Sequence, residues 1–352
     1  MNILILGFPI LKLAFEQLGH SVKTCTTDGA GDLWVPEFPT TMDQLMKTLP
    51  LQWSPDAIVL MDESTAPMYL GLERLEMPVL WYTIDSHLHL HWHRAYSAVF
   101  DIVFVAQRDA VPHYVCDPSR QEARWLPLFC CPERDRPLAL PKTHDVSFVG
   151  TIDDRWKPER SRWLRTLSRR IPLVIASGEY VTVFNRSKIV LNECAANDIN
   201  FRVFEALACG SFLLTERVGN GFDDLFRDRE HLVLYEKGEV DRLVELVDYY
   251  LHHESERIRI AQQGREAVLA AHTALHRAQS IVTALRSADL DAMVRARTES
   301  ADRIAVALDA VYGFMAQMYA WAARRYEEGS VQQAFCARAR AVFEHERTAL
   351  HV

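Results

Sequence analysis

The sequence lacks the features that identify several common classes of protein. No apolar run among its 352 residues reaches the roughly 18 that a membrane-spanning helix needs. The apolar first ten residues have no basic region and no cleavage site, so they predict a strand and not a signal peptide. The turn after this strand, residues 7–10, lacks the Gly-x-Gly-x-x-Gly pattern, and a dinucleotide cofactor is therefore not expected.

Cysteine pairs and excess basic charge are also missing. No Cys-x-x-Cys pair occurs among the seven cysteines, and the odd number favours reduced thiols in a cytosolic protein. Lys and Arg number 39 against 47 Asp and Glu, which gives a formal net charge of −8. Because contacts to nucleic acid phosphates need a basic face, we expect no nucleic acid partner.

The first third of the chain contains short hydrophobic runs that are expected to be strands. The runs are nearly continuous and do not alternate with polar residues, which is typical of strands buried on both faces of a parallel sheet. They cover residues 2–7, 21–25, 57–62, 79–84, 102–107 and 124–129.

A second series of hydrophobic runs follows a proline-rich stretch and covers residues 145–150, 172–177, 188–193, 212–216 and 231–236. The chain is therefore expected to form two doubly wound α/β domains, at residues 1–135 and 145–285, joined by a linker at 136–144. Ligands bind at the carboxyl ends of the strands in such sheets. A cleft between the two domains is the natural position for an active site.

Residues 286–352 show no strand pattern and are rich in Ala, Arg, Glu and Leu, which predicts a helical tail. Residues 323–343 have the rhythm of one tetratricopeptide-like hairpin, although such repeats normally occur in several copies. The tail could be a helical cap, or a contact for a homo-oligomer or a protein partner.

The segment 187–216 is the most informative part of the sequence. Asn200 is a suitable N-cap for a short helix that ends before Gly210. The unpaired N–H groups at the start of this helix form an anion site, and Arg202 in the first turn adds a charge suited to phosphate. Glu205 follows one turn later and suits paired hydroxyls of a ribose or sugar. A salt-bridged amphipathic helix is the plainer interpretation.

Residues 145–283, with the blocks NFRVFEALACGSFLLTE and DVSFVGTIDDR, resemble the C-terminal domain of CgeB-like glycosyltransferases. That family is similar to the larger GT-B superfamily, so the resemblance implies a GT-B-like α/β fold with two Rossmann-like domains facing a cleft. It also implies a nucleotide-sugar donor, with Glu205 as the second glutamate of a Glu-x7-Glu pattern that contacts ribose. Asn197 stands at the position of the first glutamate.

The resemblance implies further donor-binding residues. Arg202 matches an arginine that the family places before its Phe-Glu pair. The other positions that the resemblance assigns to the donor site are Gly150, Thr151, Arg186, Lys188 and His272.

The expected function is transfer of a sugar from a nucleoside-diphosphate sugar to a hydroxyl of a glycan or protein acceptor, in the cytoplasm. No Asp-x-Asp motif lies where it could anchor an obligatory metal, so no cofactor and no divalent metal are expected to be required; basic groups and a helix terminus can hold the leaving diphosphate. Two alternatives stay open: a nucleotide-sugar epimerase or hydrolase on the same fold, and a non-catalytic binding or scaffold protein.

The stretch HLHLHWH, residues 87–93, places four histidines on alternate positions. It follows an expected strand, so Asp85 and His87 lie at a carboxyl end and are candidate bases for deprotonating an acceptor hydroxyl. Histidines along the rim of a pocket are an equally simple interpretation. A metal site is less favoured, because alternate residues diverge on a helix. Asp62 and Glu63 close the preceding strand and are candidates for acceptor contact or for capping the loop.

Overall fold

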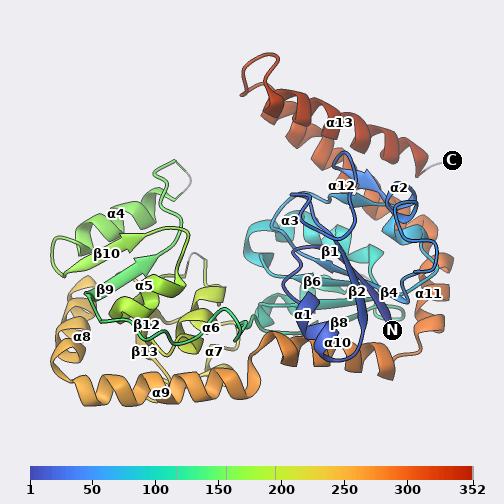
Figure 1. Cartoon of the computed structure of the whole chain (residues 1–352). Coiled ribbons are helices and arrows are strands. Elements are labelled where there is room, and N and C mark those ends of the chain that lie inside the picture. The colour runs from blue at the N-terminus through green and yellow to red at the C-terminus, as the bar shows by residue number, and fades with distance from the viewer. Residues whose placement is uncertain (116, 156, 195, 351–352) are drawn as a thin grey trace. The chain divides into compact units, whose positions relative to one another are not determined.

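The computed structural model describes residues 1–115, 117–155, 157–194 and 196–350, and the chain divides into two compact units (Figure 1). The first unit comprises Met1–Leu126 and Ala278–Val352, and the second comprises Pro127–Arg277. Each unit is built around its own parallel β-sheet. None of the helices in the described ranges is long and apolar enough to cross a membrane.

The sheet of the first unit has six strands in the order β2-β1-β4-β6-β7-β8, and every neighbouring pair is parallel. The continuous hydrophobic runs form these strands because both faces of the sheet are covered; residues 3–6 of β1, for example, are fully buried. Five expected strands are confirmed, as β1 (Asn2–Gly7), β2 (Ser21–Cys25), β4 (Ala57–Met61), β6 (Val79–Thr83) and β7 (Ile102–Val105). The sixth strand, β8 (Glu122–Trp125), lies earlier than the expected run at 124–129 and shares only residues 124 and 125 with it. A two-stranded ladder of β3 (Thr40–Thr41) and β5 (Tyr69–Leu70) was not expected.

The helices of the first unit include the C-terminal ones. They are α1 (Lys12–Gln17), α2 (Met42–Met46), α3 (Ser86–Tyr96), α11 (Leu290–Glu299), α12 (Ala301–Ala323) and α13 (Val331–Ala349), while α10 (Ala274–Ser287) runs across the division between the units. The tail is therefore helical, as predicted. Its apolar side chains, such as Leu308 and Phe343, share one hydrophobic core with Leu4 and Trp81 of the sheet.

A buried ion pair also attaches the tail to this sheet. Arg297 of α11 pairs with Asp101, and neither side chain is exposed. Arg297 also donates to the carbonyl of Met77 at 2.9 Å, and Asp101 accepts from the N–H of Val79 at 2.8 Å. Because of this packing, the units divide after residues 126 and 277, whereas the sequence analysis placed the domains at 1–135 and 145–285 and a separate tail at 286–352.

The sheet of the second unit has five parallel strands in the order β10-β9-β11-β12-β13, all of them expected. The strands are β9 (His144–Val149), β10 (Leu173–Ala176), β11 (Ser187–Asn192), β12 (Phe212–Glu216) and β13 (Val233–Tyr235). The helices are α4 (Pro158–Leu167), α5 (Val181–Arg186), α6 (Phe201–Ala208), α7 (Phe222–Leu225), α8 (Val240–His252) and α9 (Glu254–Ala271). From β9 the chain adds β10 on one side of the sheet, and from β11 it adds β12 and β13 on the other side. The carboxyl ends of these two strands are therefore the switch point at which ligands bind in open α/β sheets.

Candidate functional site

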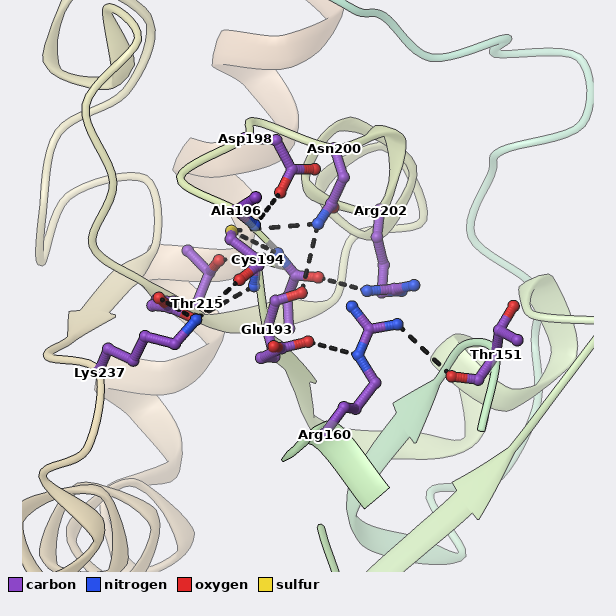
Figure 2. Close-up of polar contacts among 12 residues, drawn as sticks. Thr151, Arg160, Glu193, Cys194, Ala196, Asp198, Asn200, Arg202, Thr215 and Lys237 are labelled. Carbon is purple, nitrogen blue, oxygen red and sulfur yellow. Dashed lines mark hydrogen bonds and ion pairs between the residues drawn. The ribbon is translucent and has the colours of Figure 1, made fainter. Parts of the chain in front are cut away.

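Two arginines meet at the carboxyl ends of β9 and β11 (Figure 2). Arg202 of α6 and Arg160 of α4 each place the guanidinium carbon over the ring of Phe148, 5.1 and 5.7 Å from its centre. The negative face of an aromatic ring attracts such cations. Phe148 of β9 is fully buried, so it provides a fixed platform for both charges.

Arg202 is held by hydrogen bonding as well as by the ring. Its Nη1 donates to Oδ1 of Asn192, the last residue of β11, at 2.6 Å. Asn192 is fully buried, and its Nδ2 donates to Oγ1 of Thr215 at 2.9 Å. The hydroxyl of Tyr235 donates to the Asn192 carbonyl at 2.8 Å, so three strands fix the partner of Arg202.

Gly150, which follows β9, makes room for this arrangement. A Cβ atom at this position would lie 2.7 Å from Nη2 of Arg202 and 3.1 Å from the Phe148 ring. The N–H of Gly150 already donates to the Ala176 carbonyl at 3.0 Å. Gly150 therefore contributes space for Arg202. The next residue, Thr151, is exposed, and its carbonyl accepts from Nη1 of Arg160 at 3.5 Å.

The charges around Phe148 are predominantly positive. Nε of Arg160 donates to Oε2 of Glu193 at 2.5 Å, and this is an ion pair between largely buried groups. Burial, followed by repulsion from Arg160, lowers the pKa of Arg202 and also the pKa of Lys157. Two guanidinium groups over one ring, of which only Arg160 has an ion-paired carboxylate, favour binding of an anion.

The short helix begins as expected, with Asn200 in the extended N-cap conformation and Phe201 as the first helical residue. The Asn200 side chain does not cap the helix; its Nδ2 donates to the Glu193 carbonyl at 3.4 Å. Its Oδ1 is buried and has no hydrogen-bond partner in the described part of the chain. The first N–H groups of α6 therefore have no side-chain cap and can bind an anion next to Arg202.

Glu205 lies one turn beyond Arg202 and faces a second polar cluster. Its Oε1 accepts from Nη2 of Arg134 at 3.3 Å, and Arg134 also pairs with the fully buried Asp135 at 2.7 Å. The hydroxyl of Tyr180 donates to Asp135 at 2.6 Å. Burial, followed by repulsion from Asp135, raises the pKa of Glu205 to about 7. Its carboxylate can therefore gain or lose a proton near neutral pH.

Two of the residues assigned to the donor site lie near the amino-terminal end of β11, whereas the Arg202 cluster lies at its carboxyl end. Arg186 is the exposed last residue of α5, and Lys188 is the second residue of β11. Lys188 pairs with Asp145 near the start of β9 at 2.6 Å. A strand rises by about 3.3 Å per residue, so Lys188 is separated from Asn192 by about 13 Å along β11. The direction of the strands therefore keeps Arg186 and Lys188 away from the Arg202 cluster.

His272, another residue assigned to the donor site, is packed in a different environment. Its ring lies 5.8 and 5.3 Å from the rings of Phe204 and Phe226. Nδ1 of His272 accepts from Nη2 of Arg277 at 2.8 Å, and burial lowers its pKa to about 4. These contacts give His272 a packing role at the end of α9, and none of them reaches the arginines on Phe148.

In the first unit, the candidate bases Asp85 and His87 follow β6. Both are half-buried, and Nδ1 of His87 has no partner among the described residues. The loop is organised by Asp62 at the end of β4, whose carboxylate accepts from the N–H groups of Ser64 and Ile84 at 2.7 and 3.0 Å. Burial raises the pKa of Asp62. Asp62 therefore shapes this loop, as the loop-capping interpretation expected, and the catalytic role of Asp85 or His87 stays a prediction.

The histidine run forms part of helix α3, so its members diverge as expected. His93 is fully buried, its Nδ1 lies 2.8 Å from the Tyr114 hydroxyl, and burial lowers its pKa to about 2. Nε2 of His89 lies 3.1 Å from Oγ of Ser64, whereas His91 is exposed. Within the described ranges, no group of three or more His, Cys, Asp or Glu side chains could hold a metal ion.

Sequence reasoning missed Arg160, Asn192, Glu193 and Lys157. A usable signal was present for the basic pair, because Lys157 and Arg160 follow the Gly150 turn and begin the next helix, as Arg202 begins α6. Asn192 and Glu193 end a strand at the switch point, where polar residues are expected to face a ligand.

Known proteins are similar to this chain in part of its sequence and in its fold. Residues 136–283 match the family model described as glycosyl transferase-like. No curated protein matches the sequence. A sucrose-phosphate synthase from Thermosynechococcus elongatus has 12% identity and a TM-score of 0.56, over 82% of this chain and 98% of the synthase.

Two further solved structures have the same fold. Anabaena HepE, in complex with UDP and glucose, has 12% identity and a TM-score of 0.55, over 82% of this chain and all of HepE. An alpha-glucosyltransferase in complex with UDP-glucose and DNA has 10% identity and a TM-score of 0.56, over 81% of this chain and 99% of that enzyme. The chain thus has the α/β fold of the GT-B glycosyltransferases and carries a glycosyl transferase-like domain at residues 136–283.

Proposed function

We propose that this chain is a glycosyltransferase, of the CgeB-like kind, that moves a sugar from a nucleoside-diphosphate sugar to a hydroxyl of a glycan or protein acceptor in the cytoplasm. The observation that carries the proposal is the pair of arginines on Phe148 at the switch point of the second sheet. This pair lies within the segment that matches the glycosyl transferase-like family. The similar HepE and alpha-glucosyltransferase structures contain UDP or UDP-glucose, which supports a nucleotide donor.

The arrangement suits departure of a nucleoside diphosphate. The bond between the sugar C1 and the phosphate oxygen breaks, and negative charge develops on the diphosphate. Arg202 and the uncapped N-terminus of α6 would stabilise that charge without a metal ion. The acceptor oxygen forms the new bond to C1, and its proton passes to a base, for which Asp85 and His87 remain the candidates. Glu205, when ionised, would accept hydrogen bonds from the ribose hydroxyls.

One observation favours a second candidate, a protein that binds the donor without transferring it. Asn197 stands where the Glu-x7-Glu pattern has its first glutamate, and its Oδ1 accepts from the N–H of Gly219 at 2.8 Å. Its carbonyl accepts from the side chain of Asn220. Asn197 thus connects two loops, and the position has no carboxylate of the kind that the first glutamate would offer to the donor sugar.

Thermal unfolding with a panel of nucleoside diphosphates and their sugars tests the proposal, because a ligand that binds only the folded state raises the midpoint. We expect one ligand to raise the midpoint of the wild type and Arg202→Ala to remove that shift. Arg170→Ala is the matched control, since Arg170 belongs to the same unit and makes an exposed ion pair with Asp241. A full shift in Arg202→Ala would contradict the site. Donor turnover with and without acceptors then separates transfer, hydrolysis and binding alone.

A further inference from the structure

The two arginines on Phe148 differ in the chemistry of their partners. Arg160 is paired with a carboxylate, that of Glu193, at 2.5 Å. Arg202 is held by an uncharged group, the amide oxygen of Asn192, at 2.6 Å. Among the described residues, no carboxylate lies within ion-pair distance of Arg202, and the nearby Glu205 pairs with Arg134.

We propose that Asn192 is a positioning residue that fixes Arg202 without neutralising it, so that Arg202 is the arginine of this pair that receives the diphosphate of the donor. This inference rests on the proposed function and deepens it. Arg160, whose charge Glu193 compensates, helps to hold the Thr151 loop and the platform instead.

The orientation of the Asn192 amide is determined by its surroundings. Nδ2 donates to Oγ1 of Thr215 at 2.9 Å and lies 3.6 Å from Sγ of Cys194. If the amide were reversed, its N–H₂ group would face the guanidinium, and both groups can only donate. Thr215 is fully buried, so this contact is shielded from water. The acceptor oxygen of Asn192 must therefore face Arg202.

Three contacts constrain the Arg202 guanidinium. Phe148 covers one side of the guanidinium, Asn192 binds Nη1, and Nη2 lies against Gly150, where a Cβ atom would be only 2.7 Å away. A guanidinium that is already fixed in this way loses little conformational freedom when a phosphate binds. The entropy cost of binding is therefore smaller.

The missing counter-charge has an energetic consequence. A partly buried cation without an ion-paired carboxylate is unfavourable; burial and then repulsion from Arg160 lower the pKa of Arg202, although Glu205 and Glu193 act in the opposite direction. An incoming phosphate supplies the missing negative charge. An aspartate at position 192 would supply it permanently, and the diphosphate would then compete with a fixed carboxylate.

Binding of inorganic pyrophosphate and of nucleoside diphosphates, measured by calorimetry, tests this inference. We expect Asn192→Asp to weaken pyrophosphate binding at least tenfold, and to weaken it more than Asn192→Ala, which removes the positioning contact but adds no charge. Asn192→Ser, which keeps a neutral acceptor oxygen, should lie between the wild type and Asn192→Ala. The matched control is Asn185→Asp, which adds the same charge to a buried asparagine of α5 and should leave binding unchanged.

A double-mutant cycle shows whether Asn192 acts through Arg202. In an Arg202→Gln background, Asn192→Ala should weaken pyrophosphate binding no further, because the positioning contact to Arg202 is already lost. Should Asn192→Asp fail to fold, as judged by its unfolding midpoint, the cycle with Asn192→Ala decides the question alone.

Three results would overturn the inference: wild-type affinity in Asn192→Asp, a larger loss in Asn192→Ala than in Asn192→Asp, or an equal loss with and without Arg202. If one of these results is found while Arg202→Gln itself weakens pyrophosphate binding, the proposed function survives and only the role of Asn192 is wrong. If the wild type binds neither pyrophosphate nor any nucleoside diphosphate, the proposed function fails and this inference fails with it.

Discussion

Glu205 makes the stability of the second unit depend on pH in a way that can be calculated. Its carboxyl group has an ordinary pKa of 4.5 when the chain is unfolded, and burial raises this pKa to about 7 in the folded state. Between these values the unfolded chain has already lost the proton that the folded protein still holds. The free energy of unfolding therefore falls as the pH rises through this interval.

The size of the effect follows from the interval. Each pH unit over which the two states differ by one proton changes the free energy of unfolding by about 1.36 kcal/mol, so the interval from 4.5 to about 7 corresponds to about 3.4 kcal/mol. The side chain is only 15% exposed, so solvent screening removes little of this value. Glu205→Gln has no titrating group at position 205, so its free energy of unfolding should not show this fall. Relative to the wild type, the variant should gain about 2.5 kcal/mol between roughly pH 5 and pH 8.5.

Urea denaturation of the wild type and Glu205→Gln at both pH values measures this gain. The comparison isolates Glu205, because the other titrating groups are common to both proteins. Glu245→Gln is a control, since Glu245 forms an exposed ion pair with Arg242 on α8. A difference between the wild type and Glu205→Gln that stays constant with pH would refute the reasoning. If Glu205 also binds ribose, the stabilised variant should show a smaller thermal shift with its nucleotide.

Three further predictions test the geometry. Gly150→Ala should weaken nucleoside diphosphate binding at least tenfold in calorimetry, because the new Cβ would lie 2.7 Å from Nη2 of Arg202; unchanged affinity would show that Arg202 can move away freely. Arg297→Ala should reduce the free energy of unfolding of the first unit by about 3–5 kcal/mol in urea titrations, because it leaves Asp101 buried and unpaired; a loss below about 1 kcal/mol would contradict this. Lys188→Ala should keep the full nucleotide thermal shift, since Lys188 lies near the start of β11, and a lost shift would restore it to the donor site.

The fold could be predicted because its main signal is local. Strands buried on both faces leave continuous hydrophobic runs, and β1 and β11 lie almost where those runs indicated. The boundary between the units could not be predicted in the same way. It depends on which core the tail joins, and contacts such as that of Arg297 with Asp101 join residues that are 196 positions apart.

The candidate site was predicted in part for a similar reason. Arg202 and Glu205 could be found because the start of a helix is readable from its cap and first turn. Arg160 and Asn192 belong to other elements and meet Arg202 only when the sheet has formed. Lys188 was assigned to the site from its place in the motif, but it lies near the start of β11, whereas the Arg202 cluster lies at the end of this strand.

Helix α6 carries two charged side chains whose burial is unfavourable. It also has an apolar face that is fully buried and that offsets this cost. Arg202 has no ion-paired carboxylate, and burial raises the pKa of Glu205 although it pairs with Arg134, so both charges are unfavourable in the folded protein. Val203, Phe204 and Leu207 on the same helix are fully buried. Burial of side chains of this size contributes about 1.5–3 kcal/mol each, which is enough to hold the two groups in place. Groups that destabilise the free protein can be stabilised by a ligand of matching charge. This is the physical reason to expect that a diphosphate and its ribose, one charged and one rich in hydroxyls, bind along this helix.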